Sequence, residues 1–129
     1  MNRFLFVLLT FFVISCGKKE PEAKSSPSKV EKSEEQANLD LGKKIFNGKG
    51  QCLTCHKTSQ KVIGPSVSEI VSIYKQENAD MVAFLKGNLD PIVDPSQFMI
   101  MKININITKK MTDEELRAVV DYMYHLAEK

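Results

Sequence analysis

The sequence predicts an all-α domain of about four short helices, and three observations support this fold class. Apolar residues recur at helical spacing in four separate segments. Capping residues and glycines stand at the ends of several of these segments, where helices begin and stop. Only one stretch, residues 99–107, alternates apolar with polar or other residues in the manner of a strand.

The first expected helix covers residues 38–46. Its pairs stand four residues apart, which places each pair on one helical face: Leu41 with Ile45, and Gly42 with Phe46. Asn47 and Gly48 provide a stop. Because Gly42 has no side chain, it lets another backbone come close to this helix.

Two further helices are expected in the middle of the domain. The second presents an apolar stripe made of Val67, Ile70, Val71 and Tyr74. The third runs from Asn78 to Lys86, with Asn78 as its N-cap and Gly87 at its stop.

The last expected helix begins at a capping box formed by Thr112 and Glu115 and runs to about Glu128. Met111 stands as the partner of Leu116 in a hydrophobic staple. The wide apolar face of this helix is suited to packing against the first helix, and it comprises Leu116, Val119, Val120, Met123, Tyr124 and Leu126.

The most specific chemical feature is Cys52-Leu53-Thr54-Cys55-His56, which has the C-x-x-C-H spacing of a c-type haem attachment. Cys52 and Cys55 can each add to one vinyl group of the porphyrin, while His56 offers an imidazole nitrogen to the iron. The chain holds a single such motif, so we expect one haem c.

Three other interpretations of this motif explain less. A thioredoxin-type dithiol would follow a strand, whereas the preceding residues indicate a helix and a glycine-bearing turn. A structural zinc site needs four ligands, and only Cys16 and His125 remain outside the motif. A disulfide between Cys52 and Cys55 would close too small a loop to stabilise a domain much, and it would leave His56 unexplained.

Residues 1–15 are expected to be a secretory signal peptide. Arg3 precedes an apolar run, Phe4 to Ile14, that is too short to span roughly 30 Å of hydrocarbon. The run ends in a sequence that resembles the lipobox of bacterial lipoproteins, so Cys16 is expected to become a lipid anchor. An ordinary signal peptide followed by an unpaired cysteine is the alternative.

Residues 16–36 are expected to be the lipidated cysteine and a flexible tether, because lysine, glutamate, serine and proline dominate there and little surface can be buried. Residues 37–129 form the expected domain. It contains 12 basic and 11 acidic residues, a balance that gives no support for nucleic-acid binding.

Taken in order, these features resemble a class I cytochrome c. The features are a first helix with Gly42 and Phe46, the C-x-x-C-H motif, Gly64-Pro65, a methionine-bearing loop and a tyrosine-rich last helix. The resemblance implies a bundle of short helices wrapped around one covalently bound haem, with residues 99–107 as an extended segment lining the haem pocket. It also implies that His56 is the proximal ligand and that the carbonyl of Pro65 accepts a hydrogen bond from its other ring nitrogen.

A methionine as the sixth ligand is a further implication, and such a ligand raises the reduction potential and closes the iron to substrates. Met101 resembles the family ligand in its distance before the last helix, and it is the expected ligand; Met99 is the alternative. The proline that usually precedes the ligand is missing here. Met111, Met81 and His125 are assigned instead to the staple, the core and an exposed position.

The expected function is transfer of single electrons between protein redox partners in a respiratory chain, by a carrier that is not an enzyme. We expect a monomer on the periplasmic side, held at the membrane through Cys16. Five lysines cluster in sequence around the motif, namely Lys43, Lys44, Lys49, Lys57 and Lys61. They could steer an acidic docking surface of a partner toward the haem edge, although a merely solvated face is the alternative.

Two other functions fit the same motif. A haem protein with an open or labile sixth site would bind a gas or reduce peroxide, and it would need a distal acid or base. Arg117, the only arginine of the domain, lies in the last expected helix. The domain could instead be a fixed electron-transfer subunit of a larger oxidoreductase.

Overall fold

The structure is a computed structural model, and it describes residues 27–129. The expected signal peptide and Cys16 lie outside the described residues. The elements are α1 Pro27–Asn47, α2 Cys52–Cys55, α3 Val67–Gln76, α4 Met81–Leu85, a 3₁₀ turn η1 Pro95–Gln97, α5 Phe98–Thr108 and α6 Asp113–Ala127. No strand forms within this part of the chain, so the predicted all-α class is confirmed.

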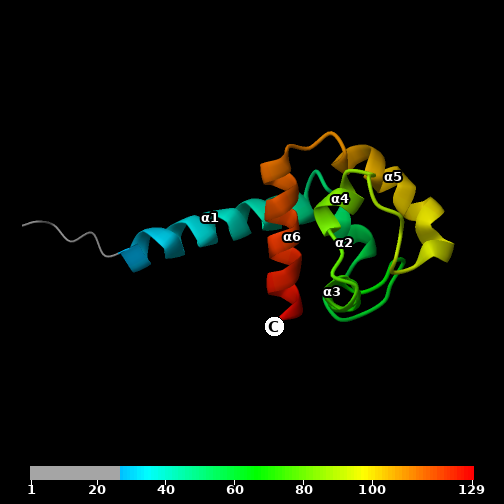
Figure 1. Cartoon of the computed structure of the whole chain (residues 1–129), viewed down its shortest axis with the longest axis horizontal. Coiled ribbons are helices and arrows are strands. Elements are labelled where there is room, and N and C mark those ends of the chain that lie inside the picture. The colour runs from blue at the N-terminus through cyan, green and yellow to red at the C-terminus, as the bar shows by residue number, and fades with distance from the viewer. Residues whose placement is uncertain (1–26) are drawn as a thin grey trace, which may run out of the picture.

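The first helix is longer than the sequence suggested. It begins at Pro27, within the segment expected to be a flexible tether, whereas its predicted start was residue 38. The side chains of residues 33–37 are exposed, and partial burial begins only at Asn38. Figure 1 shows this first half of α1 extending away from the other helices. None of the described helices is long and apolar enough to cross a membrane.

The crossing of α1 and α6 forms one side of the domain (Figure 1). Gly42 makes this crossing possible, because a Cβ atom there would lie 2.0 Å from the carbonyl oxygen of Ala118. The rings of Phe46 and Tyr122 meet edge to face, 5.7 Å apart. The predicted close approach at Gly42 is therefore confirmed, and α6 is the partner.

The predicted second and last helices are also confirmed. The four stripe residues of α3 are all buried, and α3 packs against α6. Thr112 and Glu115 form the complete capping box that begins α6. Val67 and Leu116 are fully buried, which places the centre of the core between these two helices.

The third helix begins later than predicted, and its N-cap was assigned wrongly. Asp80 is the cap, since its carboxylate accepts a hydrogen bond of 3.1 Å from the backbone N–H of Ala83. Asn78 adopts a left-handed backbone conformation with φ 47° and helps the chain to turn after α3. Gly87, with φ 79°, ends the helix as predicted.

The extended segment expected at residues 99–107 is wrong, because these residues belong to the helix α5. Burial decides the outcome: Met101, Ile105 and Thr108 are the inward positions, and their spacing of four and three residues is helical. The Thr108 hydroxyl donates a hydrogen bond of 2.6 Å to the carbonyl of Leu85 and fastens the end of α5 to α4. Tertiary contacts thus outweigh the strand-like alternation of the sequence.

Candidate functional site

An apolar cavity opens between α2, α3, α4 and α5. It contains about 970 Å³ of empty space, with its open mouth included. Cofactor pockets are lined mainly by apolar groups, with a few polar groups that fix the orientation of the ligand. The motif residues Cys55 and His56 form part of its wall, and Asp94 is the only acidic residue among the described residues that line it. The cavity therefore has the lining of a site for an apolar cofactor.

The two motif cysteines lie on α2, a single helical turn held by the loop before it. Gln51 precedes α2 in a left-handed conformation with φ 54°. The backbone N–H of Gly50 binds the carbonyl of Ile45, which fixes this loop to the end of α1. The resulting turn presents Cys55 to the cavity, whereas Cys52 is buried and is not among the residues that line it.

Burial raises the pKa of the Cys52 thiol to about 11, with a smaller contribution from the charge of Cys55 and an opposing one from a backbone hydrogen bond. A dithiol redox centre needs the opposite, a lowered pKa that favours the thiolate. The buried Cys52 is therefore unsuited to thiol exchange at neutral pH. The same burial suits a cysteine that joins an apolar group permanently.

His56 is held in one orientation. Its Nδ1 atom lies 2.7 Å from the carbonyl oxygen of Pro65, so the hydrogen bond expected between these residues is present. A carbonyl oxygen only accepts, so Nδ1 carries the proton and Nε2 keeps its lone pair. Gly64 lies directly against the ring, since a Cβ atom there would lie 2.5 Å from the Cε1 atom of His56. The ring is thus fixed from two sides, with Nε2 available to a metal.

The methionines predicted as ligands occupy different environments. Met101 is half-buried and lines the cavity together with His56, whereas Met99 is 71 % exposed and does not line it. The helical conformation of α5 separates the two residues, which the expected extended segment would have kept on one face. Met101 is therefore the better placed of the two sulfur donors.

Met81 and Met123 also line the cavity, both as buried core residues. The core assignment of Met81 is correct, although its position at the cavity wall was not foreseen. Met111 and His125 lie outside the cavity lining. His125 is half-buried rather than exposed as expected.

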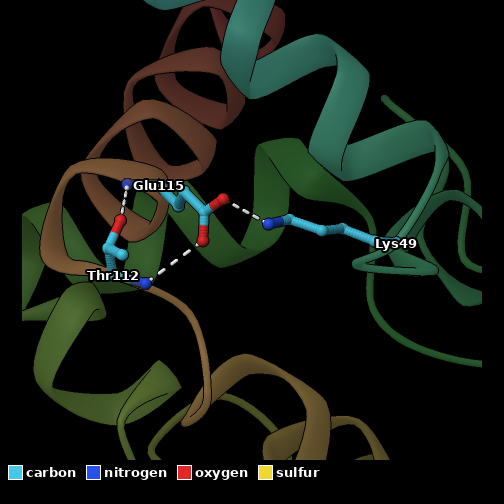
Figure 2. Close-up of polar contacts among 3 residues, drawn as sticks. All are labelled: Lys49, Thr112 and Glu115. Carbon is cyan, nitrogen blue, oxygen red and sulfur yellow. Dashed lines mark hydrogen bonds and ion pairs between the residues drawn. The ribbon is translucent and has the colours of Figure 1, made fainter.

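The five predicted lysines do not form one group at the cavity. Lys49 pairs with Glu115, the residue that closes the capping box with Thr112, as Figure 2 shows. Lys61 lies 3.4 Å from the carboxylate of Asp94 at the cavity wall. None of the five lines the cavity. At least two of these lysines are thus engaged in contacts within the domain.

Asn104 is a site residue that sequence reasoning missed. Its side-chain amide donates a hydrogen bond of 2.7 Å to the carbonyl of Gly50, which ties α5 to the loop before Cys52. Asn104 also lines the cavity, one helical turn after Met101. The sequence could not indicate this role, because the hydrogen-bond partner of Asn104 stands 54 positions away and the segment was expected to be extended.

Tyr74 is a second residue whose position at the cavity was not foreseen. It is buried, it lines the cavity, and its hydroxyl has no hydrogen-bond partner in the described part of the chain. Burial raises the pKa of this phenol to about 12, with added contributions from Asp80 and Tyr124. A buried donor without a partner is costly unless a ligand with polar groups satisfies it. The site therefore fits a haem, which combines an apolar ring with charged edge groups.

Comparison with known proteins agrees with this geometry. The family model for cytochrome c matches residues 39–127, which include the motif and the helices α3 to α6. Cytochrome c-552 of Nitrosomonas europaea is 28 % identical over 92 residues, which cover 70 % of this chain and 80 % of that protein.

Proposed function

The chain belongs to the cytochrome c family and carries haem c bound through Cys52 and Cys55, and on this premise we propose that it is a membrane-anchored monohaem electron carrier of a respiratory chain. When bound, haem c supplies an iron that takes up and releases one electron at a time.

His56 is the proposed proximal ligand and Met101 the proposed sixth ligand. The observation that carries the assignment is their common position on one cavity, with the His56 ring fixed by Pro65 so that Nε2 keeps its lone pair. With haem bound, a thioether donor from Met101 together with the imidazole of His56 would favour ferrous iron and would leave the iron no position for a substrate. Asn104 supports the proposed ligand by linking its helix to the attachment loop.

A carrier role rather than catalysis is supported by the cavity lining. Among the described residues that line it, His56 is the only histidine, and neither arginine nor lysine contributes. Peroxide chemistry requires a distal acid or base to move protons, and Asp94, the acidic residue of the lining, is already engaged by Ser96 and Lys61. Arg117, the candidate weighed for that role, does not line the cavity.

The ligand assignment is tested by the absorption spectrum of the oxidised holoprotein. Replacement Met101→Ala is expected to abolish the weak red band of sulfur-to-iron charge transfer, whereas Met99→Ala is the matched control and should retain it. A band that survives Met101→Ala but disappears in Met81→Leu or Met123→Leu would assign the sulfur to a different cavity methionine. A wild-type protein that is high-spin and lacks the band would favour an open sixth site.

Membrane attachment and periplasmic location are proposed from the residues 1–16 alone, where an apolar run ends in the lipobox-like sequence before Cys16. Mass spectrometry of the mature protein tests this. The expected N-terminal residue is Cys16 bearing acyl chains. A mature protein cleaved elsewhere, or a free Cys16 thiol, would contradict the anchor.

A further inference from the structure

The wall of the haem cavity contains one acidic side chain. Among the described residues that line the cavity, Asp94 is the only acid, and neither lysine nor arginine contributes. The three residues before it, Pro91, Ile92 and Val93, are apolar and belong to the same wall. The side chain of Asp94 is 21 % exposed. A charge that is largely out of the solvent acts more strongly on its neighbours than a charge in bulk water.

Contacts within its own turn hold the Asp94 carboxylate in place. The hydroxyl of Ser96 donates a hydrogen bond of 2.7 Å to Oδ1 of Asp94, and the backbone N–H of Gln97 donates one of 3.2 Å to the Asp94 carbonyl. The hydrogen bond from Ser96 is the main cause that lowers the pKa of Asp94; Lys61 lowers it further, and partial burial opposes both. Asp94 therefore carries a fixed negative charge at neutral pH.

Lys61 pairs with this carboxylate from the solvent side. Its Nζ atom lies 3.4 Å from Oδ2 of Asp94, yet the Lys61 side chain is 60 % exposed and does not line the cavity. An ion pair with one partner largely in water is weak and is screened by salt. The pair thus has its negative member at the cavity wall and its positive member outside, so Lys61 offsets only part of the charge that the cavity experiences.

We propose that Asp94 lowers the reduction potential of the haem site by stabilising its oxidised state. Oxidation passes one electron to an external acceptor and leaves one additional positive charge in the cavity, which the carboxylate attracts. Asp94 is ionised in both states, so no proton moves in this step. The residue therefore opposes the sulfur donor proposed at Met101, which favours ferrous iron. The inference rests on the proposed electron-carrier function and names a residue that sets its potential.

A purely structural role for Asp94 makes different predictions. Asp94 precedes the 3₁₀ turn that leads into α5, so its removal could shift the helix that carries Met101. In that case loss of the Ser96 hydrogen bond should disturb the site as much as loss of the charge. In an electrostatic role only the charge matters, and removal of the carboxylate and removal of its counter-charge should move the potential in opposite directions.

The test measures the midpoint potential of the holoprotein by redox titration with small soluble mediators, at neutral pH and low ionic strength, where screening is weak. Asp94→Asn removes the charge and keeps the shape of the side chain, whereas Asp94→Glu keeps the charge. Lys61→Gln removes the counter-charge, and Ser96→Ala removes the hydrogen bond and leaves the carboxylate. The matched control is Asp90→Asn, because Asp90 is exposed in the same connecting segment and does not line the cavity.

Asp94→Asn is expected to raise the potential. The equilibrium constant for electron exchange with a reference couple should change at least about twofold, the effect of one unit charge roughly 10 Å away in bulk water. Twofold corresponds to about 18 mV, at 59 mV per tenfold. Lys61→Gln should lower the potential by a smaller amount. Asp94→Glu, Ser96→Ala and Asp90→Asn should remain close to wild type, and the sulfur-to-iron band should be the same in all the variants as in wild type.

Three outcomes would overturn the proposal: a potential of Asp94→Asn that is unchanged or lower, shifts of the same sign in Asp94→Asn and Lys61→Gln, or an equally large shift in Asp90→Asn. If Asp94→Asn does not retain haem, Lys61→Gln decides, and a potential that does not fall contradicts the inference. The proposed function fails in a different way, since wild type would then show no reversible one-electron couple with the same mediators.

Discussion

Replacement Gly64→Ala should displace the His56 ring without altering any functional group. The new Cβ atom would lie 2.5 Å from Cε1 and 2.9 Å from Nδ1 of His56. Ordinary contact begins at 3.4 Å, so the ring and the added methyl must separate by about 0.9 Å. The backbone at Gly64 does not have a positive φ, and strain of the new residue itself does not contribute.

A separation of 0.9 Å is large compared with the tolerance of the hydrogen bond that fixes the ring. If the ring moves away from Pro65 by this amount, the 2.7 Å contact between Nδ1 and the carbonyl oxygen becomes about 3.6 Å, which is no longer a hydrogen bond. Loss of one such bond typically costs about 0.5–1.5 kcal/mol. Loss of a contact that orients a metal ligand costs roughly 10–100-fold in metal affinity or activity.

The assay combines urea unfolding of the holoprotein, followed by far-ultraviolet circular dichroism, with its absorption spectrum and midpoint potential. We expect a lower unfolding midpoint and a shifted potential for Gly64→Ala. Val62→Ala is the matched control, because Val62 lies in the same loop, is 54 % exposed and does not line the cavity. Wild-type stability, spectrum and potential for Gly64→Ala would refute the argument that Gly64 and Pro65 together hold the ring.

Three further predictions concern the framework. Thr108→Val keeps the shape of the side chain but leaves the buried carbonyl of Leu85 without its 2.6 Å hydrogen bond, so urea titration should show a loss of about 1–3 kcal/mol. Gly42→Ala inserts a methyl group 2.0 Å from the carbonyl oxygen of Ala118, and the same titration should show a destabilisation of about 1–3 kcal/mol or more; an unchanged midpoint would contradict the close helix crossing. The pKa of Glu115 is lowered, first by its hydrogen bond with a lysine and then by the capping hydrogen bond, so its contribution to stability is complete above its ordinary pKa and is lost as the pH falls through the lowered value. The unfolding free energy measured across acidic pH should therefore fall less steeply for Glu115→Gln than for wild type. Parallel curves for the two proteins would show that Glu115 does not contribute to the pH dependence of stability.

Several features of the protein could be predicted because they are local in sequence. The attachment motif, the α3 stripe, the stop at Gly87 and the capping box of α6 each depend on residues within one or two turns of one another. Such patterns follow from backbone geometry and from the hydrogen bonds of helix ends. The haem assignment belongs to this group, since two thiols and an imidazole at fixed spacing define its chemistry.

Other features depended on which distant segments pack together. Burial of Met101, Ile105 and Thr108 against the rest of the domain decided the conformation of α5. The alternating sequence of this segment does not show which of its residues will be buried. The same packing separated Met101 from Met99 and brought Asn104 to the carbonyl of Gly50.

Charge pairing was likewise a tertiary outcome. Lys49 and Glu115 stand 66 residues apart and meet only because α6 crosses the end of α1. The sequence by itself therefore determined the chemistry of the attachment site and the helix ends at Gly87 and Thr112, through short-range geometry. Tertiary structure decided which methionines and which amide line the cavity and which lysines pair with carboxylates, because packing brings together residues that the sequence keeps far apart.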